Sequence, residues 1–433
     1  MSMPTIKTFS RAVVVSIALL ASASLSSAAT ITAASPSRAD VGAAVASANY
    51  GDTVVIPGGA ATWNSQLTIN KGITLQGNGS SGSNRTVITS NVPAGFFSFL
   101  IYYSPDATSI SANIPFRVTG IECNGNGSSG SGCVFVENTT TDSTKPITKV
   151  RIDHNYFHDA YNSSYTQRCV LTNGMAWGVI DHNTFLNCQK TFDEEGSDSI
   201  GWAAAYAIGS SNYMYFEDNT VTNAITGLSL ITSGGQGGRY VVRHNVLDTT
   251  GQTDSGQTYD IHNHISDRGT VGAEIYDNVL TTRAGAYQFV DHRGGTGIIF
   301  NNRIIKPGSD ITFDVREEFN GQYDTVRNTY DWHNTYGSSS GLENPATEQC
   351  TQGCSIILLN VNYWYPSFGL EANRPSSCSA NTFWASTDTE RIFKCTSANT
   401  WTTYYQSYTY PHPLTVSGSS GAPSAPTNLR IVP

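Results

Sequence analysis

The sequence predicts an all-β protein, a parallel β-helix whose chain winds through stacked coils. The main observation is a repeat of the form apolar-x-x-Asn-x-apolar, as in IDHNYF at 152–157 and IDHNTF at 180–185. Spacings of about 20–50 residues between such units are typical of solenoids and propellers. Short alternating strands and turn residues fill each unit, without sustained helical periodicity or a Gly-His and Trp-Asp propeller signature. The predicted ladder residues are Asn155, Asn183, Asn219, Asn245, Asn278, Asn302 and Asn328.

Each asparagine is predicted to turn a corner of its coil, because Asn tolerates left-handed backbone. Stacked coils place each amide about one strand spacing from the next, so the amides can bond coil to coil. We therefore expect these asparagines to be structural. GITLQGNG at 72–79 and FRVTGIECNG at 116–125 are expected to be earlier, more divergent units.

The N-terminal segment predicts export. Lys7 and Arg11 precede an uncharged apolar run at 12–25 and small residues at 26–29, as in a secretory signal peptide. A buried N-terminal helix is the alternative. The predicted divisions are a signal peptide at 1–29, the β-helix at 30–340, a capping segment at 341–415, and a linker with the start of a further module at 416–433.

Eight cysteines in an exported chain favour disulfides over a metal site. Neighbour pairing would close short loops, although the sequence does not fix the connectivity. The expected pairs are Cys123–Cys133, Cys169–Cys188, Cys350–Cys354 and Cys378–Cys395.

The chain carries 24 basic and 33 acidic residues, a formal net charge of −9. Such a protein is not a general polyanion binder, so we expect no nucleic-acid partner and no membrane partner. An acidic polymer would need a local basic strip or a bridging cation. We expect a secreted monomer, extracellular or periplasmic, with no organic cofactor.

The repeat resembles right-handed parallel β-helix proteins of the pectate-lyase-like superfamily. The stretch from 51 to 79 is similar to the beginning of such a helix, and TWTTYYQSYTYPHPL at 400–414 is similar to the closing segment of secreted bacterial members. The resemblance covers roughly residues 38–415 and implies the fold. It implies a polysaccharide-degrading enzyme less specifically, because the superfamily also contains hydrolases, esterases, epimerases and adhesins.

Strand alternation predicts an acidic column on one outer face. If Val150 and Ile152 point inward, Asp153 points outward, and the same offset selects Asp181 and Glu217. Clustered carboxylates repel unless a cation or an arginine neutralises them, and Ca²⁺ prefers oxygen ligands. The Ile-Asp-His string, present twice, resembles one near the calcium groove of pectate lyases. Asp153, Asp181 and Glu217 are therefore candidate Ca²⁺ ligands, with solvated surface carboxylates as the alternative.

A second cluster follows in TYDIHNHISDRG at 258–269, FVDHRGGTG at 289–297 and TFDVREEF at 312–319. Arg268, Arg293 and Arg316 lie about one coil apart and are expected to stack. A surface ion-pair ladder is the alternative to a site. The candidate catalytic residues are Arg268, Arg293, His264, His292, Tyr259, Asp260, Asp267 and Asp291, and the candidate substrate-binding residues are Arg316, His262, Asp314 and Glu317.

The leading functional hypothesis is a lyase that cleaves a uronic-acid glycan by β-elimination. The reaction needs a neutralised uronate carboxylate, a base for the C5 proton and an acid for the leaving oxygen. Arg268 and Arg293 are assigned to the carboxylate first and to the base second, since arginine stays protonated. His264 or His292 is the expected base, and Tyr259 could return the proton.

Two alternatives remain open at this point. A glycoside hydrolase would use paired carboxylates such as Asp260, Asp267 and Asp291, or the acidic run at 193–198, expected in a loop. The Asn-Thr-Asp, Asp-Asp and Gly-His-Gly strings of β-helix polygalacturonases are absent from the sequence. The second alternative is a non-catalytic glycan-binding or adhesin β-helix.

Overall fold

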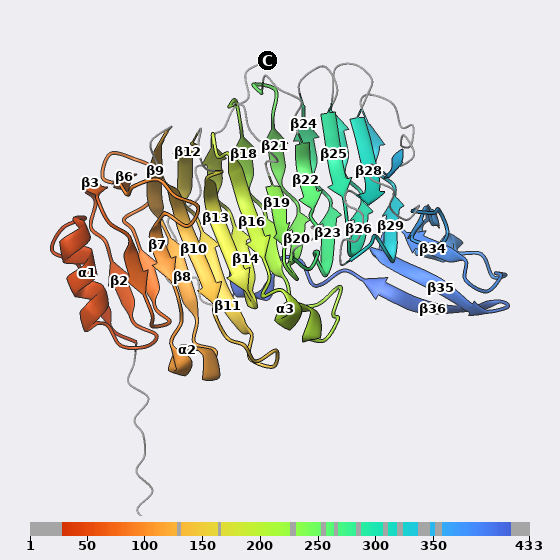
Figure 1. The fold of residues 1–433 in the computed structure, drawn as a ribbon, viewed down its shortest axis with the longest axis horizontal. Helices are drawn as coiled ribbons and strands as arrows, with labels where there is room; N and C mark the ends of the chain where they lie inside the picture. The colour runs from red at the N-terminus through yellow and green to blue at the C-terminus, as the bar shows by residue number, and fades with distance from the viewer. Residues whose placement is uncertain are drawn as a thin grey trace, which may run out of the picture.

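The fold is a right-handed parallel β-helix, as predicted (Figure 1). We analysed a computed structural model that describes residues 28–127, 131–162, 166–225, 231–252, 257–263, 267–282, 287–305, 311–317, 324–336, 347–350 and 357–416. Each coil contributes one strand to each of three parallel sheets, here called A, B and C. The predicted signal peptide and the predicted C-terminal module lie outside the described residues.

Sheet A contains β1 (Thr30–Thr32), β2 (Thr53–Val55), β5 (Thr74–Gln76), β8 (Phe116–Thr119), β11 (Ile147–Asp153), β14 (Ala176–Asp181), β17 (Met214–Glu217), β20 (Arg239–Arg243), β23 (Gly272–Tyr276), β26 (Thr296–Phe300), β29 (Thr329–Trp332) and β32 (Tyr363–Trp364). Sheet B contains β3 (Gly59–Trp63), β6 (Thr86–Ser90), β9 (Ile121–Gly127), β12 (Tyr156–Ala160), β15 (Thr184–Leu186), β18 (Thr220–Thr222), β21 (Val246–Asp248), β24 (Val279–Thr281), β27 (Arg303–Ile305) and β30 (Thr335–Tyr336).

Sheet C contains β4 (Leu67–Ile69), β7 (Phe99–Tyr103), β10 (Gly132–Asn138), β13 (Arg168–Gly174), β16 (Lys190–Glu195), β19 (Ile231–Gly235), β22 (Gln257–Ile261), β25 (Tyr287–His292), β28 (Ile311–Glu317) and β31 (Thr347–Cys350). Because β31 and β32 pair with the preceding coil, the parallel stacking continues past residue 340, where the cap was predicted to begin.

A four-stranded C-terminal sheet follows the coils: β33 (Ser367–Gly369), β34 (Phe383–Ser386), β35 (Arg391–Ser397) and β36 (Thr400–Gln406). The helices are α1 (Arg38–Ser47), α2 (Ala107–Ser111), α3 (Ser199–Ala203), α4 (Pro413–Val416) and a 3₁₀ turn, η1 (Glu371–Asn373). Among the described helices, none has the length and apolar character needed to cross a membrane.

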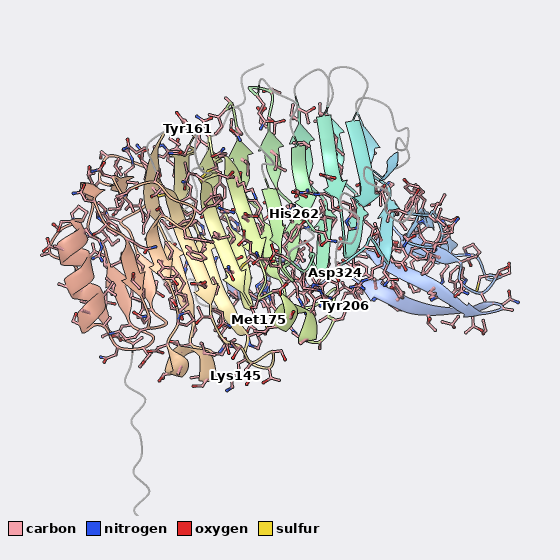
Figure 2. All side chains as sticks on the ribbon, in the orientation of Figure 1. Lys145, Tyr161, Met175, Tyr206, His262 and Asp324 are labelled. Carbon is pink, nitrogen blue, oxygen red and sulfur yellow. A yellow bond between two sulfur atoms is a disulfide. The ribbon has the colours of Figure 1, made fainter. Side chains whose placement is uncertain are left out.

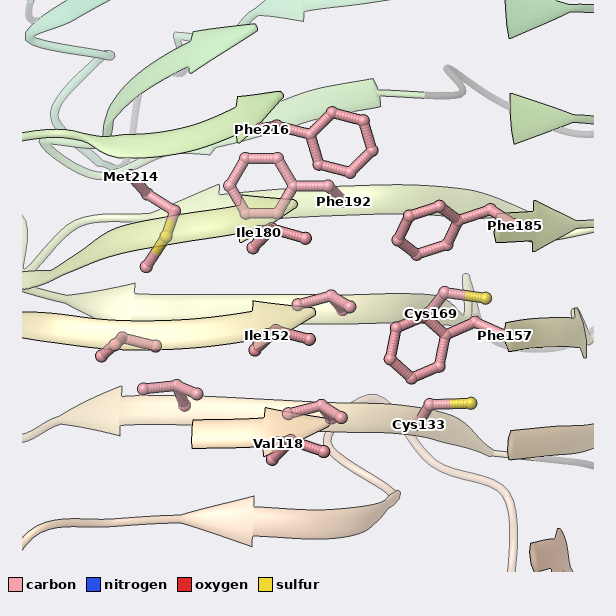
Figure 3. Close-up of a cluster of buried hydrophobic side chains, with 14 of the residues drawn as sticks. Val118, Cys133, Ile152, Phe157, Cys169, Ile180, Phe185, Phe192, Met214 and Phe216 are labelled. Carbon is pink, nitrogen blue, oxygen red and sulfur yellow. The ribbon is translucent and has the colours of Figure 1, made fainter. Parts of the chain in front are cut away.

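The interior of the coil stack is a continuous apolar core. Side chains from all three sheets meet there, for example Ile152 from sheet A, Phe157 from sheet B and Phe192 from sheet C (Figure 3). Aromatic rings stack from coil to coil, with 5.2 Å between the ring centroids of Phe157 and Phe185. Helix α1 buries Val41 in this core and closes the N-terminal end of the stack (Figure 1).

The predicted asparagine ladder exists between coils. The Oδ1 atom of Asn183 accepts the backbone N–H of Asn155 at 2.9 Å, and the same bond recurs along the stack. The prediction was wrong at the last rung, where Asn334 replaces Asn328. Asn328 is exposed and precedes β29, so the repeat unit is YDWHNTY at 330–336.

The corner itself is turned by the residue before each asparagine, which corrects the predicted mechanism. These residues have positive φ angles between 54° and 56°, in the left-handed region, and are His154, His182, Asp218, His244, Asp277, Asn301 and His333. His, Asp and Asn are the non-glycine residues most often found there. The ladder asparagine is thereby freed to point inward and bond to the next coil.

Three predicted disulfides are present, Cys123–Cys133, Cys169–Cys188 and Cys378–Cys395. The first two lie in the coil interior, where all four cysteines are buried. The third joins β35 to the segment before β34. Cys354, and with it the fourth predicted pair, lies outside the described residues.

The C-terminal sheet packs on the outer face of sheet A. Outward rings of Tyr276, Phe300 and Trp332 stack along sheet A, with 4.6 and 4.2 Å between successive centroids. Tyr405 packs on this row and donates to Glu274 Oε2 at 2.6 Å. Most aromatic residues of the C-terminal segment therefore pack against the coils.

Two carboxyl groups also join the C-terminal sheet to the coils. Asp277, at a coil corner, is hydrogen-bonded to Glu390, in the turn between β34 and β35. Burial, followed by the nearby charge of Glu390, raises the pKa of Asp277 to about 7. Asp277 therefore keeps its proton in mildly acidic solution and loses it as the pH rises through about 7.

We expect Asn219→Ala to lower the free energy of unfolding by about 3 kcal/mol or more, because several buried backbone groups would lose their partners. Asn219 accepts the N–H of Asn183 and donates to the carbonyls of Ile180 and Glu217. Urea unfolding followed by circular dichroism measures the effect. The exposed neighbour Thr220→Ala is the control, and equal midpoints for the two variants would contradict a stabilising ladder.

Asp277→Asn should become increasingly stabilising relative to wild type as pH rises from about 4 to about 7. In the unfolded chain the carboxyl ionises near its ordinary pKa of 3.8, whereas the folded chain holds the proton until about pH 7. The wild type therefore loses stability over this window and the neutral amide does not. Unfolding free energies across the window test this, and Glu390→Gln added to Asp277→Asn should give little further gain. A pH-independent difference would contradict the raised pKa of Asp277.

Candidate functional site

The predicted acidic column forms on the outer face of sheet A. Asp153, Asp181 and Glu217 occupy the same register position in three successive strands. Arg243 takes this position in the next strand, as the repeat offset predicted. All three carboxylates are fully buried, so this column is not an open surface.

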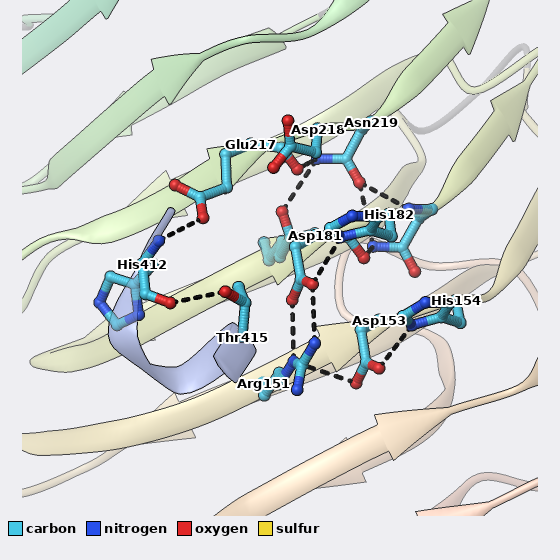
Figure 4. Close-up of polar contacts among 12 residues, drawn as sticks. Arg151, Asp153, His154, Asp181, His182, Glu217, Asp218, Asn219, His412 and Thr415 are labelled. Carbon is cyan, nitrogen blue, oxygen red and sulfur yellow. Dashed lines mark hydrogen bonds and ion pairs between the residues drawn. The ribbon is translucent and has the colours of Figure 1, made fainter. Parts of the chain in front are cut away.

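Arginines from the same face neutralise the column. Arg117 donates to both oxygens of Asp153 at 2.7 and 2.6 Å. Arg151 donates to both oxygens of Asp181 at 3.0 and 2.9 Å (Figure 4). Burial alone would raise the pKa of Asp153, but hydrogen bonds from Arg117 and His154 and the charges of Arg117 and Arg151 lower it to about 2. A cation needs carboxylates that are not already neutralised, so these residues do not fit Ca²⁺. No group of three or more His, Cys, Asp or Glu side chains in the described ranges could hold a metal ion.

The C-terminal segment closes the rest of this face through Arg243. Its guanidinium donates to Glu217 Oε2 at 2.7 Å, to the hydroxyl of Tyr276 at 2.9 Å, and to the carbonyls of Tyr408 at 2.7 Å and Thr409 at 2.9 Å. The backbone N–H of the residue His412 also reaches Glu217, at 2.7 Å. Sheet A therefore offers no open groove where the acidic column was expected to bind a cation.

The outer face of sheet C carries a second set of charged residues. Asp193, Asp260, Asp291 and Asp314 hold one register position, with Thr232 between the first two. The run at 193–195, expected in a loop, belongs to strand β16. This alternation turns Glu194 toward the interior, where burial raises its pKa well above the ordinary value.

Asp260 binds two neighbours at once. Its carboxylate accepts from Arg293 Nε at 3.1 Å and lies 3.2 Å from His262 Nδ1. A second nitrogen of Arg293 contacts both Asp260 and His262 Nδ1. Although burial opposes it, the charge of Arg293 holds the pKa of Asp260 well below its ordinary range. The side chain of His262 remains 27% exposed, so solvent and ligands can reach it.

A neighbouring basic pair was missed by the sequence analysis. Arg168 and Lys190 begin adjacent strands in register. Arg168 donates to Asp193 at 2.6 Å and to Glu195 at 3.2 Å, while Lys190 donates to Asp193 at 3.0 Å. Burial, followed by the charge of Asp193, raises the pKa of Glu195. Arg168 and Lys190 each begin a strand, and Lys190 precedes the acidic run in the same strand. This position was the sequence signal that could have identified the basic pair.

Gly235 carries no side chain and lies next to both Glu195 and His262. Gly235 pairs in register with Glu195, and a Cβ atom built on it would lie 3.5 Å from His262 Cδ2. Its φ of 79° also favours glycine at this position. Glu195 and His262 thus flank a position that carries no side chain, on a face that also presents Arg293.

Two predicted catalytic residues point the wrong way. Tyr259 and His292 are buried in the coil interior, on the opposite side of their strands from Asp260 and Asp291. His292 Nε2 lies 2.7 Å from Thr329 Oγ1, and burial lowers the pKa of His292 to about 3. Because adjacent strand residues face opposite sides, Asp291 and His292 could not both belong to one outer face.

Arg268 does not stack on Arg293, which corrects the predicted arginine column. Its guanidinium donates to both carboxylate oxygens of Asp324 at 3.0 and 2.9 Å and lies over the ring of Trp202, 4.4 Å from its centroid. Arg327 approaches Trp202 at the same distance. Figure 2 shows His262 and Asp324 in the same half of the stack. This cluster holds the segment of α3 against the coils.

The remaining predictions fall partly outside the described residues. His264 is not described, and Asp267 is half-buried beside the Arg268 turn. For Asp314, Arg316 and Glu317 only the backbone is described, and they lie in strand β28 as expected. Their roles as substrate-binding residues stay predictions.

Comparisons with known proteins were made for the whole chain. No family model matches it, and no curated protein matches it. Among solved structures, it is similar to the crystal structure of an alginate lyase from Paenibacillus sp. str. FPU-7, with a TM-score of 0.43 and 14% sequence identity. The alignment covers 78% of this chain and 98% of that chain. We therefore argue function from the side chains of this protein.

Arg243→Ala is expected to cost about 3–5 kcal/mol of unfolding free energy, because it leaves Glu217 buried without its cation. Arg243→Lys should recover little, since an ammonium group cannot reproduce the planar set of bonds. Urea unfolding and limited proteolysis of the C-terminal segment measure both effects. The exposed Arg303→Ala is the matched control, and similar protease resistance in both alanine variants would contradict the proposed anchoring role.

Proposed function

We propose that the protein is a secreted polysaccharide lyase that cleaves a uronic-acid glycan on the outer face of sheet C. The observation that carries the proposal is the cluster of Asp260, His262 and Arg293, where a carboxylate holds an accessible imidazole beside a guanidinium. Sheet A also carries imidazole–carboxylate pairs at its corners, His154 with Asp153 and His182 with Asp181, and Arg117 and Arg151 bind their carboxylates. We place the reaction on sheet C, because Glu195 adds a carboxyl group with a raised pKa that is not fully buried.

His262 is proposed as the base that removes the C5 proton. Nδ1 faces both the Asp260 carboxylate and a guanidinium nitrogen of Arg293. The role as a base requires the tautomer whose Nδ1–H donates to Asp260 and whose lone pair lies on Nε2, with the guanidinium donating to Asp260 and not to Nδ1. Asp260 also stabilises the imidazolium that forms during the step, because it stays ionised. The histidine replaces His292 in this role, since His292 faces the interior.

Arg293 is proposed to stabilise the negative charge that develops on the uronate carboxylate. Proton removal next to a carboxylate creates an enolate-like charge, and a fixed cation lowers the barrier most when it is already in place. Asp260 and Asp291 hold the Arg293 guanidinium, with 3.5 Å between Arg293 Nε and Asp291. Arg168 and Lys190 lie on the same face, where they bind Asp193 and Glu195.

Glu195 is proposed as the acid that protonates the leaving oxygen. Its raised pKa keeps a proton on the carboxyl group at a higher pH than an ordinary glutamate. Gly235 places no side chain between this acid and His262. The reaction then breaks the C4–O bond, forms the C4–C5 double bond and moves one proton from C5 to the enzyme.

A glycoside hydrolase is the second candidate. The observation that favours it is a pair of carboxyl groups on one face with pKa values shifted apart, upward for Glu195 and downward for Asp260. Asp260 is bonded to both His262 and Arg293, which limits its ability to activate a water molecule. This arrangement favours the lyase.

Export is part of the proposal and rests on chemistry within the chain. Three disulfides in the described residues fit an oxidising compartment. The partner is taken to be a polysaccharide bound by a monomer. Nucleic acid remains disfavoured by the negative net charge.

His262→Ala and Arg293→Ala should each reduce kcat/KM by about 100-fold or more on the preferred glycan, since general bases typically contribute about 10²–10⁴-fold. The assay follows the short-wavelength ultraviolet absorbance of the unsaturated uronate product on pectate, alginate and glucuronan. His182→Asn is the matched control, because His182 lies at the corner between sheets A and B and Asn tolerates its left-handed backbone. Circular dichroism checks that each variant is folded.

Three outcomes would overturn the proposal. Reducing ends released without unsaturated product would identify a hydrolase. Binding without any product would identify a glycan-binding protein. Full activity in a folded His262→Ala variant would move the base to another residue.

A further inference from the structure

A row of aromatic rings lies on the outer face of sheet C, near its N-terminal end. Tyr102 stacks on Phe135 with 5.0 Å between centroids and 22° between planes. Phe97 stacks on the same ring at 5.8 Å and 24°. Phe96 and Phe97 are 56% and 57% exposed, so apolar ring surface faces solvent here.

The rings beneath are held rigidly. Phe99 is fully buried, lies 5.3 Å from Phe135 and crosses Gly132, where an added Cβ would come within 2.2 Å of the Phe99 ring. The loop that carries Phe97 is tied to the coil by Gln167, whose side-chain amide donates to the carbonyl of Gly95 at 3.2 Å. The aromatic surface is therefore preorganised.

This surface is collinear with the candidate site. Tyr102, Phe135, Leu171 and Asp193 occupy one register position in successive strands, and Asp260 continues the position two strands further. Four strand spacings separate Phe135 from Asp260, or about 19 Å. Leu171 and Asp193 are themselves buried, so it is the direction of the column that relates the aromatic rings to Asp260. A chain running parallel to the axis of the stack would come first to the rings and then to the exposed part of His262.

We propose that Phe97 and Tyr102, which both stack on the buried ring of Phe135, form a distal subsite that stacks a pyranose unit of the same acidic glycan, several units from the bond that is cleaved. This inference rests on the proposed function and names where the enzyme holds a long substrate. The ligand is a pyranose because its axial C–H groups give it an apolar face, while its hydroxyl and carboxylate groups stay at the edge.

Charged side chains border the aromatic surface. The hydroxyl of Tyr102 donates to Glu137, which fixes the tilt of the ring. Arg168 begins the strand next to Phe135, and Lys190 begins the following strand. These two side chains are paired with Asp193 and Glu195 and lie between the aromatic surface and Asp260.

The test measures glycan binding separately from cleavage. All proteins carry His262→Ala, which prevents turnover, and are run in native gels containing pectate, alginate or glucuronan. Phe97→Ala should weaken retention by about 3- to 10-fold, as expected for the loss of one aromatic contact. Tyr50→Ala is the matched control, because Tyr50 is also an exposed aromatic residue but lies between α1 and β2.

With His262 intact, Phe97→Ala should raise KM for long chains, and should do so less for chains too short to span about 19 Å. Equal retention of Phe97→Ala and the background protein would overturn the subsite. Loss of retention in Tyr50→Ala to the same degree would also overturn it. If the glycan is retained but never cleaved by the wild type, the lyase proposal fails while the Phe97 comparison still decides the subsite. If none of the three glycans is retained, both proposals fail.

Discussion

Coil-to-coil registration by the buried asparagines is the constraint on which the rest of the molecule depends. Each ladder amide binds the backbone of the coil before it and the side chain of the coil after it. A left-handed residue such as His182 turns the corner and leaves the asparagine pointing inward. Every coil therefore returns with its strands at the same height, and residues at one repeat offset become vertical neighbours.

Because the coils are in register, side chains of the same kind become neighbours on adjacent strands. Sheets A and C accommodate these neighbours differently. On sheet A, arginines insert between the carboxylates, so that Arg117 and Arg151 neutralise Asp153 and Asp181. The same column becomes aromatic from Tyr276 onward, and there the C-terminal sheet packs. Sheet C runs in the opposite sense. Its outer column begins with aromatic rings and becomes charged at Asp193, toward the later coils.

The aromatic and charged residues follow opposite orders along sheets A and C, and the C-terminal segment packs on sheet A. The aromatic end of sheet A is covered by Tyr405 and its neighbours, and its charged part is closed by Arg243 and the segment at 408–415. On sheet C the charged part keeps an accessible imidazole at His262. A β-elimination needs a base, a cation and an acid held at fixed positions, and neighbouring rigid strands supply such fixed positions.

The sequence by itself determined the repeat, because the pattern apolar-x-x-Asn-x-apolar recurs at the corner of successive coils and can be recognised there. It also determined the strand alternation, which put Asp153 and Asp181 on one outer face. It favoured neighbouring disulfide pairs, and the structure fixed three of them. Alternation could have separated Asp291 from His292 as well. Only the tertiary structure decided which face is covered, since the segment that covers sheet A lies more than 100 residues away from Glu274 in the chain. It also decided that Arg268 binds Asp324 and not the column of Arg293, because the length of the intervening turns, and not the repeat offset, sets where that arginine lies.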